Sequence, residues 1–563
     1  GGAAIIILFF LIAYRCFKIS IQTTDVFDKA LAFGLTVMFA MQTFIIVGGV
    51  TKMIPLTGIT LPFVSYGGTS IVVSFASLGI IQAISAKSER GKNLQRIKRT
   101  GGCAMQNNKR IIRVLVLVSF MFLALVSYLL YFNMFQAEKV SSNPYNKRQW
   151  EDERYVKRGS IYDRDGELLA ETVVDSDNRT RRYPKGRLYS HIIGYYSRVY
   201  GKNLLEMNYD KELMGHGDIN LSFNEIRSGY DLNLTIDNDL QKYAYDKLNG
   251  RSGAVVAMEP STGKILAMVS LPDFDPSVDA LEKNWQYIVE KEDSPLLARA
   301  TGGLYAPGST YKIVTTTAAY NGGYTQKTFN DTGEFKAGGI KVENYGGKSY
   351  GEIGLKKAFE VSSNFAFCTL GYELGAENVK NTAESFGVNK DINTDIPVSK
   401  SRIDYKKMTN EDAALVSIGQ GQLLMTPLHV AMVGSTIANG GKMMKPYLVN
   451  SVTTSSGQTL SNAKQEQLYQ AISPDCAAYV KELMVSTVKQ GTGTKATISG
   501  VTVAGKTGTA ENETSKDHAW FVGFAPAENP QIAVAVLLEY DGGSGGANAA
   551  PIARDVMKKY LGK

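Results

Sequence analysis

The chain has 563 residues, more than a single hydrophobic core normally organises, so several domains are expected. Hydrophobic residues make up 44% and charged residues 20%, which is ordinary for a globular protein. The net charge of +8 would fit nucleic-acid binding, but the excess is concentrated in one cluster, and no nucleic-acid partner is expected. Composition also changes along the chain: residues 1–135 are membrane-like and the remainder is typical of a soluble protein.

Four uncharged apolar stretches precede the soluble part, at residues 1–14, 30–50, 64–85 and 114–135. The last three are long enough for a helix to cross a bilayer, which takes about 20 residues. The first stretch is shorter and lacks the basic start and cleavage site of a signal peptide. We therefore expect it to be a helix that is cut by the start of this chain.

A basic segment separates the third and fourth apolar stretches, and its cations are opposed only by Glu89. The nine cations are Lys87, Arg90, Lys92, Arg96, Lys98, Arg99, Lys109, Arg110 and Arg113. A cationic segment between two apolar spans is typical of a cytoplasmic loop under the positive-inside rule. No aromatic residues interleave it, which disfavours a nucleic-acid patch. We expect everything after residue 135 to be extracytoplasmic.

The region from residue 136 to about 249 is polar, with short strands and turns. Asp165-Gly166 lies between the apolar pairs at 161–162 and 168–169, a pattern that predicts a β-hairpin. This region is expected to be a β-rich spacer without catalytic residues.

A second folded region begins near residue 252. Its predicted elements are strands at 254–258, 265–269, 520–524 and 532–538, a strand that leads into Lys506, and a final helix at 551–561. Five strands and several helices predict an α+β fold, in which helices cover both faces of a five-stranded antiparallel sheet.

The motif Ser309-Thr310-Tyr311-Lys312 follows Pro307-Gly308 and opens the apolar run at 313–320, which predicts a helix entered through a turn. Ser309 and Lys312 are three residues apart and therefore share a face of that helix. The serine would lie at the positive end of the helix dipole, with an amine within reach to take its proton. This arrangement favours nucleophilic catalysis by serine, with lysine as the base.

Two further motifs follow in the order Ser362-Ser363-Asn364 and Lys506-Thr507-Gly508. The second comes after an alternating strand at 501–504, so that Lys506, Thr507 and Thr509 can line one edge and bind a substrate carboxylate. Each motif is weak alone, because Ser-x-x-Lys occurs by chance roughly a few times in a chain of this length. Their order and setting carry the prediction.

Cysteine and histidine residues offer no competing chemistry. Cys16, Cys103, Cys368 and Cys476 show no metal-binding or disulfide spacing, and Cys368 and Cys476 are expected to be small core residues. The histidines His191, His216, His429 and His518 are scattered, so that neither a zinc site nor a Ser-His-Asp triad is predicted. No metal or other cofactor is expected, and lysine remains the base for Ser309.

Together, these motifs resemble those of the penicillin-binding proteins, and within them the class B (monofunctional) peptidoglycan D,D-transpeptidases. The likeness runs from about Met105 to the end of the chain. It extends to the segments at 158–166, 417–421, 426–428 and 518–523. Departures are small: Ala298 and Ser277 stand where the family often has asparagine.

The resemblance implies the transpeptidase fold of this family, in the cell membrane of a bacterium. It also implies an enzyme of the serine-type D-Ala-D-Ala carboxypeptidase class, which forms an acyl-serine intermediate in cell-wall synthesis and is inhibited by β-lactams. The substrate would be a peptidoglycan stem peptide that ends in D-Ala-D-Ala. Ser309 would be the nucleophile and Lys312 the base, made neutral by desolvation or by the nearby cation Lys506. Ser362 would relay the proton to the leaving amine, and the backbone N–H groups of Ser309 and Thr509 would form the oxyanion hole. The other substrate-binding residues would be Asn364, Lys506, Thr507, Gly508 and Thr509.

Residues 42–45 and 55–70 resemble the C-terminal end of the SEDS family, the RodA/FtsW-type glycan polymerases. The likeness covers the last three of ten expected helices, and Ile46 stands where that family often has asparagine. Met105 precedes a second stretch that is first basic and then apolar, as at the start of a transpeptidase. We therefore expect Met105 to be the original start of the transpeptidase, and the chain to join the end of one reading frame to the whole of the next. A separate SEDS polymerase is the expected partner, with other cell-wall synthesis proteins.

The expected domains are a truncated SEDS-like membrane fragment (1–104), a basic segment with a transmembrane anchor (105–135), a non-catalytic pedestal (136–249) and the transpeptidase domain (250–563). Other functions remain open: a non-catalytic activator of a SEDS polymerase, or a β-lactam-binding sensor. A β-lactamase would need a deacylating base, which the sequence does not identify. Whether the protein serves division, elongation or sporulation, and which cross-link it makes, is not decided by the sequence.

Overall fold

The computed structural model describes residues 2–50, 62–63, 68–96, 108–131, 156–175, 178–215, 227–511 and 516–563. It divides into two compact units, Gly1–Asn146 and Lys147–Lys563. Several sequence expectations lie outside the described residues: the loop at 51–61, Cys103, Met105, His216 and the end of the fourth apolar stretch at 132–135.

The smaller unit is helical. Its helices are α1 (Gly2–Gln22), α2 (Val26–Val50), α3 (Gly68–Arg96) and α4 (Asn108–Tyr131). Phe9, Phe17, Phe39 and Phe122 pack in its core. Among the described residues, Val26–Val47 and Ile71–Glu89 are long and apolar enough to cross a membrane, while the apolar part of α4, Ile111–Ala124, is shorter. The apolar stretch expected at 1–14 is part of the longer helix α1.

The larger unit is built around the expected five-stranded antiparallel sheet, in the order β10-β9-β23-β22-β21. Its strands are β9 (Gly253–Met258), β10 (Ile265–Leu271), β21 (Ala504–Ala510), β22 (His518–Ala525) and β23 (Ile532–Leu538). The strand predicted at 501–504 is wrong in position, because β21 begins at Ala504 and runs through the Lys506-Thr507-Gly508 motif. Val501 instead forms an isolated bridge with Ile498 and does not join the sheet. As the edge strand, β21 keeps one side without a sheet neighbour among the described residues.

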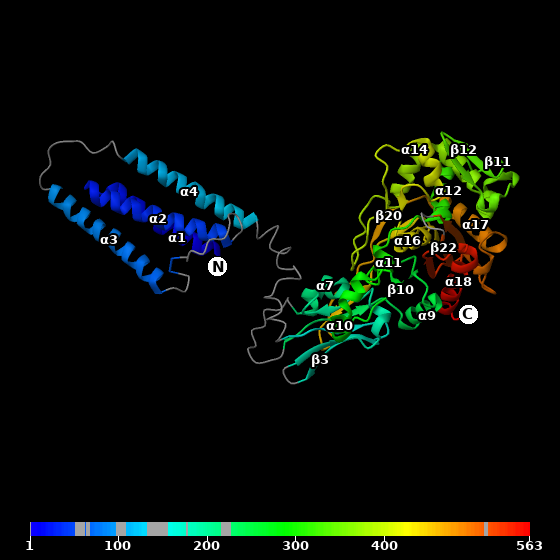
Figure 1. Ribbon diagram of the computed structural model, residues 1–563, viewed down its shortest axis with the longest axis horizontal. Coiled ribbons are helices and arrows are strands. Elements are labelled where there is room, and N and C mark those ends of the chain that lie inside the picture. The colour runs from blue at the N-terminus through cyan, green and yellow to red at the C-terminus, as the bar shows by residue number, and fades with distance from the viewer. Residues whose placement is uncertain are drawn as a thin grey trace. The chain divides into compact units, whose positions relative to one another are not determined.

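Helices cover both faces of this sheet. They include α9 (Asn238–Leu248), α16 (Pro427–Ala438), α17 (Pro474–Gln490) and α18 (Ala550–Tyr560). α12 (Lys312–Asn321) packs against α14 (Asn364–Ser385) and α17. Val256 belongs to the core that contains α16, whereas its neighbour Val255 belongs to the core that contains α18. Successive side chains of a strand point to opposite faces, so β9 packs on helices at both sides. α9 and α18 lie next to each other on one of these faces (Figure 1).

A six-stranded sheet, in the order β19-β18-β8-β2-β3-β4, forms the centre of the pedestal region. Its strands are β2 (Ile161–Tyr162), β3 (Leu168–Asp175), β4 (Asn178–Arg182), β8 (Asp231–Leu234), β18 (Val449–Thr453) and β19 (Thr459–Asn462). β2 and β3 pair antiparallel around Gly166, whose φ is 85°, so the hairpin predicted at Asp165-Gly166 is confirmed. β18 pairs with β8, with Val452 opposite Leu232, so this sheet joins chain segments on both sides of residue 249.

Two small sheets lie beside α12 and α14 at one end of this unit (Figure 1). In them β11 (Thr328–Asp331) pairs with β14 (Gly351–Gly354), and β12 (Glu334–Ala337) pairs with β13 (Ile340–Glu343). The remaining short elements are β1 (Val156–Lys157), β5 (Tyr196–Ser197), β6 (Gly201–Lys202), α7 (Leu204–Asn208), α8 (Asp210–Leu213), β7 (Arg227–Ser228), α10 (Val278–Glu290), α11 (Arg299–Gly302), α13 (Leu355–Val361), β15 (Arg402–Ile403), α15 (Asn410–Ser417), β16 (Leu423–Leu424), β17 (Lys442–Met444) and β20 (Gln467–Gln470).

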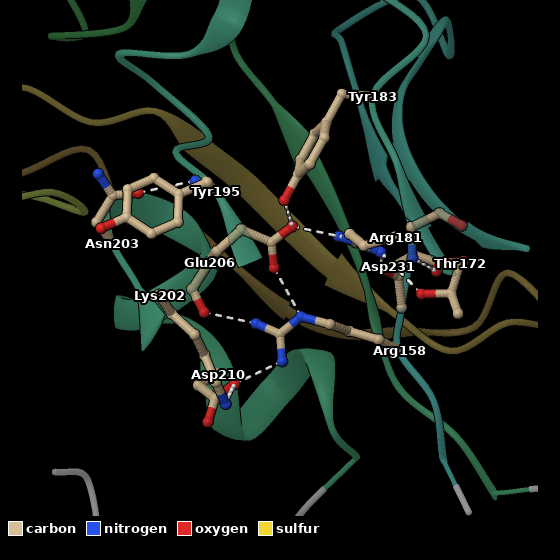
Figure 2. A network of polar contacts seen from close by, with 12 residues as sticks. Arg158, Thr172, Arg181, Tyr183, Tyr195, Lys202, Asn203, Glu206, Asp210 and Asp231 are labelled. Atoms are coloured by element: carbon tan, nitrogen blue, oxygen red, sulfur yellow. Dashed lines mark hydrogen bonds and ion pairs between the residues drawn. The ribbon is translucent and has the colours of Figure 1, made fainter. Parts of the chain in front are cut away.

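The pedestal contains a buried network of charged side chains (Figure 2). Glu206, which has no exposed surface, accepts hydrogen bonds from Arg158 Nε at 2.6 Å and from Arg181 Nε at 2.7 Å. Arg158 also donates to Asp210, which in turn pairs with Lys202 at 2.7 Å. Glu206 and Asp210 thus pair with three cations, Arg158, Arg181 and Lys202, and each cation contacts at least one of these carboxylates. Arg158 begins the segment at 158–166, so this network contains one of the motifs found in the sequence.

Candidate active site

Ser309 lies on a single 3-10 turn, η3 (Gly308–Tyr311), which leads directly into α12. The predicted entry through Pro307-Gly308 is confirmed, but the α-helix begins at Lys312 and not at the serine. Gly308 has a left-handed backbone (φ 54°), and its N–H donates to Gly419 O at 2.9 Å, which holds the turn in place. Ser309 is partly exposed, and its Oγ makes no hydrogen bond among the described residues.

Two glycines allow this turn to lie directly against its neighbours. A Cβ on Gly419, where φ is 77°, would lie 1.9 Å from Gly308 O. A Cβ on Gly308 would lie 2.7 Å from Thr509 O. Side chains at either position would therefore displace the turn from β21 or from the loop after α15. The segment at 417–421 appeared in the family resemblance, but the sequence alone did not indicate that Gly419 supports Ser309.

Lys312 is fully buried, and its ammonium group reaches the Ser362-Ser363-Asn364 motif. Its Nζ donates to Ser362 O at 2.8 Å, to Asn364 Oδ1 at 2.8 Å and to Ser362 Oγ at 3.2 Å. The ring of Phe367 lies 5.3 Å away on another side. Lys312 thus joins the first two motifs, although it makes no hydrogen bond to Ser309 Oγ in the described part of the chain.

Lys506 is also fully buried and approaches Ser362 from β21. Its Nζ donates to Ser362 Oγ at 2.9 Å and to Thr507 O at 3.1 Å. Ser362 Oγ therefore contacts both lysines, and all three motifs meet at this one hydroxyl group. No carboxylate forms an ion pair with either lysine among the described residues.

This setting changes the proton affinity of both amines. Burial lowers the pKa of Lys312 to about 7, although electrostatic interactions with Cys368 and Asp331 oppose the shift. Burial and the nearby Lys312 charge lower the pKa of Lys506 well below the usual lysine range. Of the two means expected from the sequence, desolvation is therefore the one that accounts for the shift of Lys312. Two buried ammonium groups at one hydroxyl repel each other, so one of the two amines is neutral near pH 7.

The remaining motif residues lie on β21 beside the serine turn. Thr507 Oγ1 is 2.6 Å from Thr492 Oγ1, a contact that the sequence did not predict. A Cβ on Gly508 would lie 3.0 Å from Thr310 Cγ2 and 3.1 Å from Pro307 O, so a glycine lets the strand pass close to the turn. Thr509 is partly exposed next to Gly308. The edge of β21 and the turn of Ser309 are therefore adjacent.

Ser362 occupies a strained position between α13 and α14. Its backbone is left-handed, with φ 60° and ψ 42°, which is uncommon for a residue other than glycine. Ser363 caps α14 by accepting a hydrogen bond from Ala366 N at 3.0 Å, and Asn364 Nδ2 donates to Glu343 O at 2.9 Å. Asp331 and Asn344, which no sequence motif indicated, support this turn from behind.

A cavity is lined in part by residues 302–306, which precede the Ser309 turn. Its lining includes Tyr305, Gln420, Glu511, His518 and Tyr540. His518 stacks edge to face with Tyr305 at 5.5 Å between ring centres, and burial lowers its pKa. The motif segments at 417–421 and 518–523 therefore contribute to this cavity as well as to the core.

Groups that could hold a metal ion are absent from the described residues, in which no cluster of three His, Cys, Asp or Glu side chains is found. Cys368 and Cys476 are buried free thiols in the core, as predicted. His191, His429 and His518 are buried and bonded to backbone groups, and none of them hydrogen-bonds Ser309. Lysine is thus the amine base that the structure brings closest to the serine motifs.

Three models of known families match the chain. The penicillin binding protein transpeptidase domain matches residues 253–558, which is more than half of the chain. The penicillin binding protein A dimerisation domain matches residues 158–230, and the cell cycle protein family of FtsW, RodA and SpoVE matches residues 1–90. The matched ranges include all three motifs, the pedestal network, the helices α1 and α2 and most of α3.

Individual relatives agree with these matches. The peptidoglycan D,D-transpeptidase PbpA of Mycolicibacterium smegmatis is 37% identical over 81% of this chain and 99% of its own length. The structure of penicillin-binding protein A from M. tuberculosis, a ceftriaxone acyl-enzyme complex, superposes with a TM-score of 0.69 at 35% identity, covering 73% of this chain and 99% of that one. Pseudomonas aeruginosa PBP2 gives a TM-score of 0.64 at 29% identity, covering 72% and 95%. The chain therefore belongs to the penicillin-binding protein transpeptidase family.

Proposed function

We propose that this protein is a peptidoglycan D,D-transpeptidase that cross-links stem peptides ending in D-Ala-D-Ala and is acylated by β-lactams. The observation that carries the proposal is the meeting of two buried lysines at Ser362 Oγ, at 3.2 and 2.9 Å, without a carboxylate ion pair among the described residues. Such a cluster supplies a neutral amine near pH 7 beside an exposed serine, which is what acyl transfer by serine requires.

In the proposed reaction, Ser309 Oγ attacks the carbonyl carbon of the penultimate D-alanine while its proton passes to neutral Lys312. Lys312 lies three residues after Ser309, and its Nζ, which contacts Ser362 and Asn364, would turn toward the serine to take the proton. The peptide bond then breaks, and the proton returns through Ser362 to the amine of the departing D-alanine. A serine ester and free D-alanine result.

A second amine completes the cycle. An amino group of a neighbouring stem peptide attacks the ester, its proton passes back through the same groups, and a new peptide bond forms as Ser309 is regenerated. Attack by water instead would give the carboxypeptidase product of the same enzyme class. The choice between them depends on how well water is excluded from the acyl-enzyme.

Binding contacts follow from the edge position of β21. Thr507 and Thr509, with the amino group of Lys506, would hold the terminal carboxylate. Gly508 would let the peptide lie close to the strand, and Asn364 would bind a substrate amide. The backbone N–H groups of Ser309 and Thr509 would form the oxyanion hole, where each donor typically contributes about 3 kcal/mol. The close packing of Gly308 against Thr509 supports this assignment.

Labelling with fluorescent penicillin tests the proposal. The wild-type chain should become covalently labelled, and intact-mass analysis should show one adduct. Ser309→Ala should not label, whereas the control Ser456→Ala, in an exposed turn between β18 and β19, should label like wild type. Persistent labelling of Ser309→Ala would disprove the site, and absence of labelling in the folded wild type would favour a non-catalytic activator.

The lifetime of the adduct separates a transpeptidase from a β-lactamase. Two carboxylates, Glu511 and Glu539, line the nearby cavity. Glu539 is held by Arg299 at 2.6 Å, and neither carboxylate hydrogen-bonds Ser309 among the described residues. We expect the penicillin adduct to persist for minutes or longer in mass analysis. Turnover of penicillin within seconds would place the protein among β-lactamases.

We also propose the domain order 1–104, 105–135, 136–249 and 250–563, with the basic segment inside the cell and the last two domains outside. Cross-linking of peptidoglycan requires the catalytic domain to lie outside the cell. The cations between Lys87 and Arg113 would oppose transfer of the basic segment across the membrane. Cysteines introduced in the basic segment should react with a membrane-impermeant maleimide only after the cells are opened. Labelling of that segment from outside intact cells would contradict the topology.

The SEDS-like residues 1–90 are proposed to associate with the membrane without taking part in acylation. A variant that starts at Met105 should still be anchored by α4 and labelled by penicillin at the wild-type rate. A separate SEDS polymerase is the proposed partner for glycan synthesis. Loss of labelling in the shortened variant, or glycan extension by the purified chain alone, would show that these residues have a further role.

A further inference from the structure

Asp331 is a buried carboxylate that the proposed reaction does not use. It ends strand β11 and is only 1% exposed. Among the described residues it forms no ion pair with lysine or arginine, and all of its partners are hydrogen-bond donors. Burying a carboxylate without a directly paired cation is costly, so its position requires a physical explanation.

The partners of Asp331 are the residues that hold the Ser362-Ser363-Asn364 turn. Ser363 Oγ donates to Asp331 Oδ2 at 2.6 Å, while the same oxygen caps α14. Asn344 Nδ2 donates to Asp331 Oδ1 at 2.8 Å, and Asn344 Oδ1 accepts from Phe365 N at 3.0 Å. Asp331 thus holds the Ser362–Asn364 turn in place by two routes: directly through Ser363, and through Asn344, which contacts the start of α14.

The turn that Asp331 holds is the one that both lysines contact. Ser362 has a left-handed backbone, which typically costs a residue other than glycine about 1–3 kcal/mol unless its surroundings hold it. Lys312 Nζ binds the carbonyl oxygen of Ser362 and the side chain of Asn364, both at 2.8 Å. Ser363 and Asn344 therefore link a buried negative charge to the atoms that position the two amines.

We propose that Asp331 is a positioning residue for acylation, which holds the Ser362–Asn364 turn against Lys312 through Ser363 and Asn344 and supplies a buried negative charge to the lysine cluster. This inference rests on the proposed function, because it concerns the same amines. Its two parts, the hydrogen-bonded clamp and the charge, can be separated by substitution.

The charge acts on a small set of groups. Besides Asp331 from β11, the groups that interact with Lys312 are Lys506 from β21 and Cys368 from α14. The interaction with Asp331 raises the pKa of Lys312 and so opposes the effect of burial. Removal of this negative charge should therefore make Lys312 neutral at a lower pH. Because neutral Lys312 is the base, acylation should then begin at a lower pH.

The test is the pH dependence of penicillin acylation, measured on the full chain in detergent. Asp331→Asn keeps the size of the side chain and an oxygen that accepts from Ser363, but it removes the charge. We expect the acidic limb of its rate profile to move to lower pH by about half a unit or more. Ser363→Ala removes the clamp and keeps the charge, so it should lower the maximal rate roughly tenfold with the limb unmoved.

A matched control is Asp163→Asn in the pedestal, where a buried aspartate likewise accepts hydrogen bonds from backbone N–H groups. This variant can lose stability, but its rate profile should keep the wild-type limb. An unchanged limb in folded Asp331→Asn would disprove the electrostatic part of the proposal. A wild-type maximal rate in Ser363→Ala would disprove the clamp.

If Asp331→Asn does not fold, the exchange variant Asp331→Ser/Ser363→Asp keeps one hydroxyl and one carboxylate at the same contact. Its carboxylate lies nearer to Lys312, so its limb should stay at the wild-type pH or move higher. A limb at lower pH would overturn the charge effect. If the proposed function itself is wrong, Ser309 of the wild type will not be labelled at all. If only this inference is wrong, the wild type will be labelled, and the acidic limb of the pH–rate profile will lie at the same pH in wild type and Asp331→Asn.

Discussion

The larger unit contains two buried charge clusters that differ in their balance of charge. In the pedestal, Arg158 and Arg181 share the carboxylate of Glu206, and Lys202 and Arg158 share Asp210 (Figure 2). In the active site, Lys312 and Lys506 share only the neutral hydroxyl of Ser362. The lysines, the arginines and Glu206 in these clusters are almost completely removed from water, whereas Asp210 is 22% exposed.

The difference shows how partners decide what burial does to an ionisable group. Burial opposes ionisation of Glu206, but Arg181 and Arg158 outweigh it, so that the pKa of this carboxyl lies below its ordinary value. No carboxylate forms an ion pair with Lys312 in the described part of the chain, and burial lowers the pKa of Lys312 to about 7. The pedestal cluster therefore keeps its charges and holds structure, whereas the active-site cluster can exchange a proton near neutral pH.

The largest effect is expected from Lys312→Met, which removes the amine that we propose takes the proton of Ser309. The penicillin acylation rate should fall about a thousandfold, within the range typical of general-base catalysis. Thermal stability should be unchanged or higher, because a desolvated amine is replaced by an apolar side chain. Lys356→Met, at a lysine that is 52% exposed, is the control and should behave like wild type in both measurements. A near-normal acylation rate in Lys312→Met would remove lysine from the proposed mechanism.

Glu206→Gln should produce the opposite pattern. Two buried guanidinium groups would lose their shared carboxylate, a change that typically costs about 3–5 kcal/mol of unfolding free energy. Denaturant unfolding should detect this loss, while the folded fraction should still be acylated at the wild-type rate. An unchanged unfolding free energy would mean that the Arg158–Glu206–Arg181 contact is not stabilising the pedestal.

The two clusters should also respond to pH in opposite ranges. The pKa values of Lys312 and Lys506 are lowered on folding, so the unfolded chain binds more protons from about pH 7 upward, and their contribution to stability rises between about pH 7 and 10. The pKa values of Glu206 and Asp210 are also lowered on folding, so the stability that they contribute is present above about pH 4.5 and is lost on acidification.

Thermal unfolding across this range, compared between wild type and the two variants above, measures these contributions. Lys312→Met should flatten the rise above pH 7, and Glu206→Gln should flatten the loss at acid pH. The same slope in each variant as in wild type would show that the clusters do not titrate on unfolding.

The smallest effect is expected at the surface of the same pedestal. Arg182 and Glu171 approach to 3.6 Å, with side chains that are 64% and 29% exposed. Because exposed ion pairs contribute little, Arg182→Ala should change the unfolding free energy by less than about 1 kcal/mol. This variant is the matched control for Glu206→Gln. A loss of several kcal/mol of unfolding free energy in Arg182→Ala would mean that any lost arginine ion pair destabilises the pedestal, whether the pair is buried or exposed.

Local sequence patterns determined much of the fold. The hairpins at Asp165-Gly166 and between β9 and β10, the strands β22 and β23 and the final helix α18 were all predicted from residue alternation and turn residues. These features depend on backbone preferences within a few residues, so a single chain segment contains the information. The predicted position of β21 was wrong, because residues 501–504 also show an alternating pattern, but Val501 pairs with Ile498 and not with the sheet.

The chemistry of the candidate site was predicted as a set of motifs, whereas its physical state depends on contacts across the chain. Ser309 and Lys312 are neighbours on one turn, but Lys506 meets Ser362 from 144 residues away. Nothing in the three motifs pointed to Gly419 beneath the turn or to Asp331 behind Ser363. The sequence by itself therefore determined which side chains could react. Only the tertiary structure decided that both lysines are buried, and that no described carboxylate forms an ion pair with them, because desolvation depends on packing between segments that are distant in the chain.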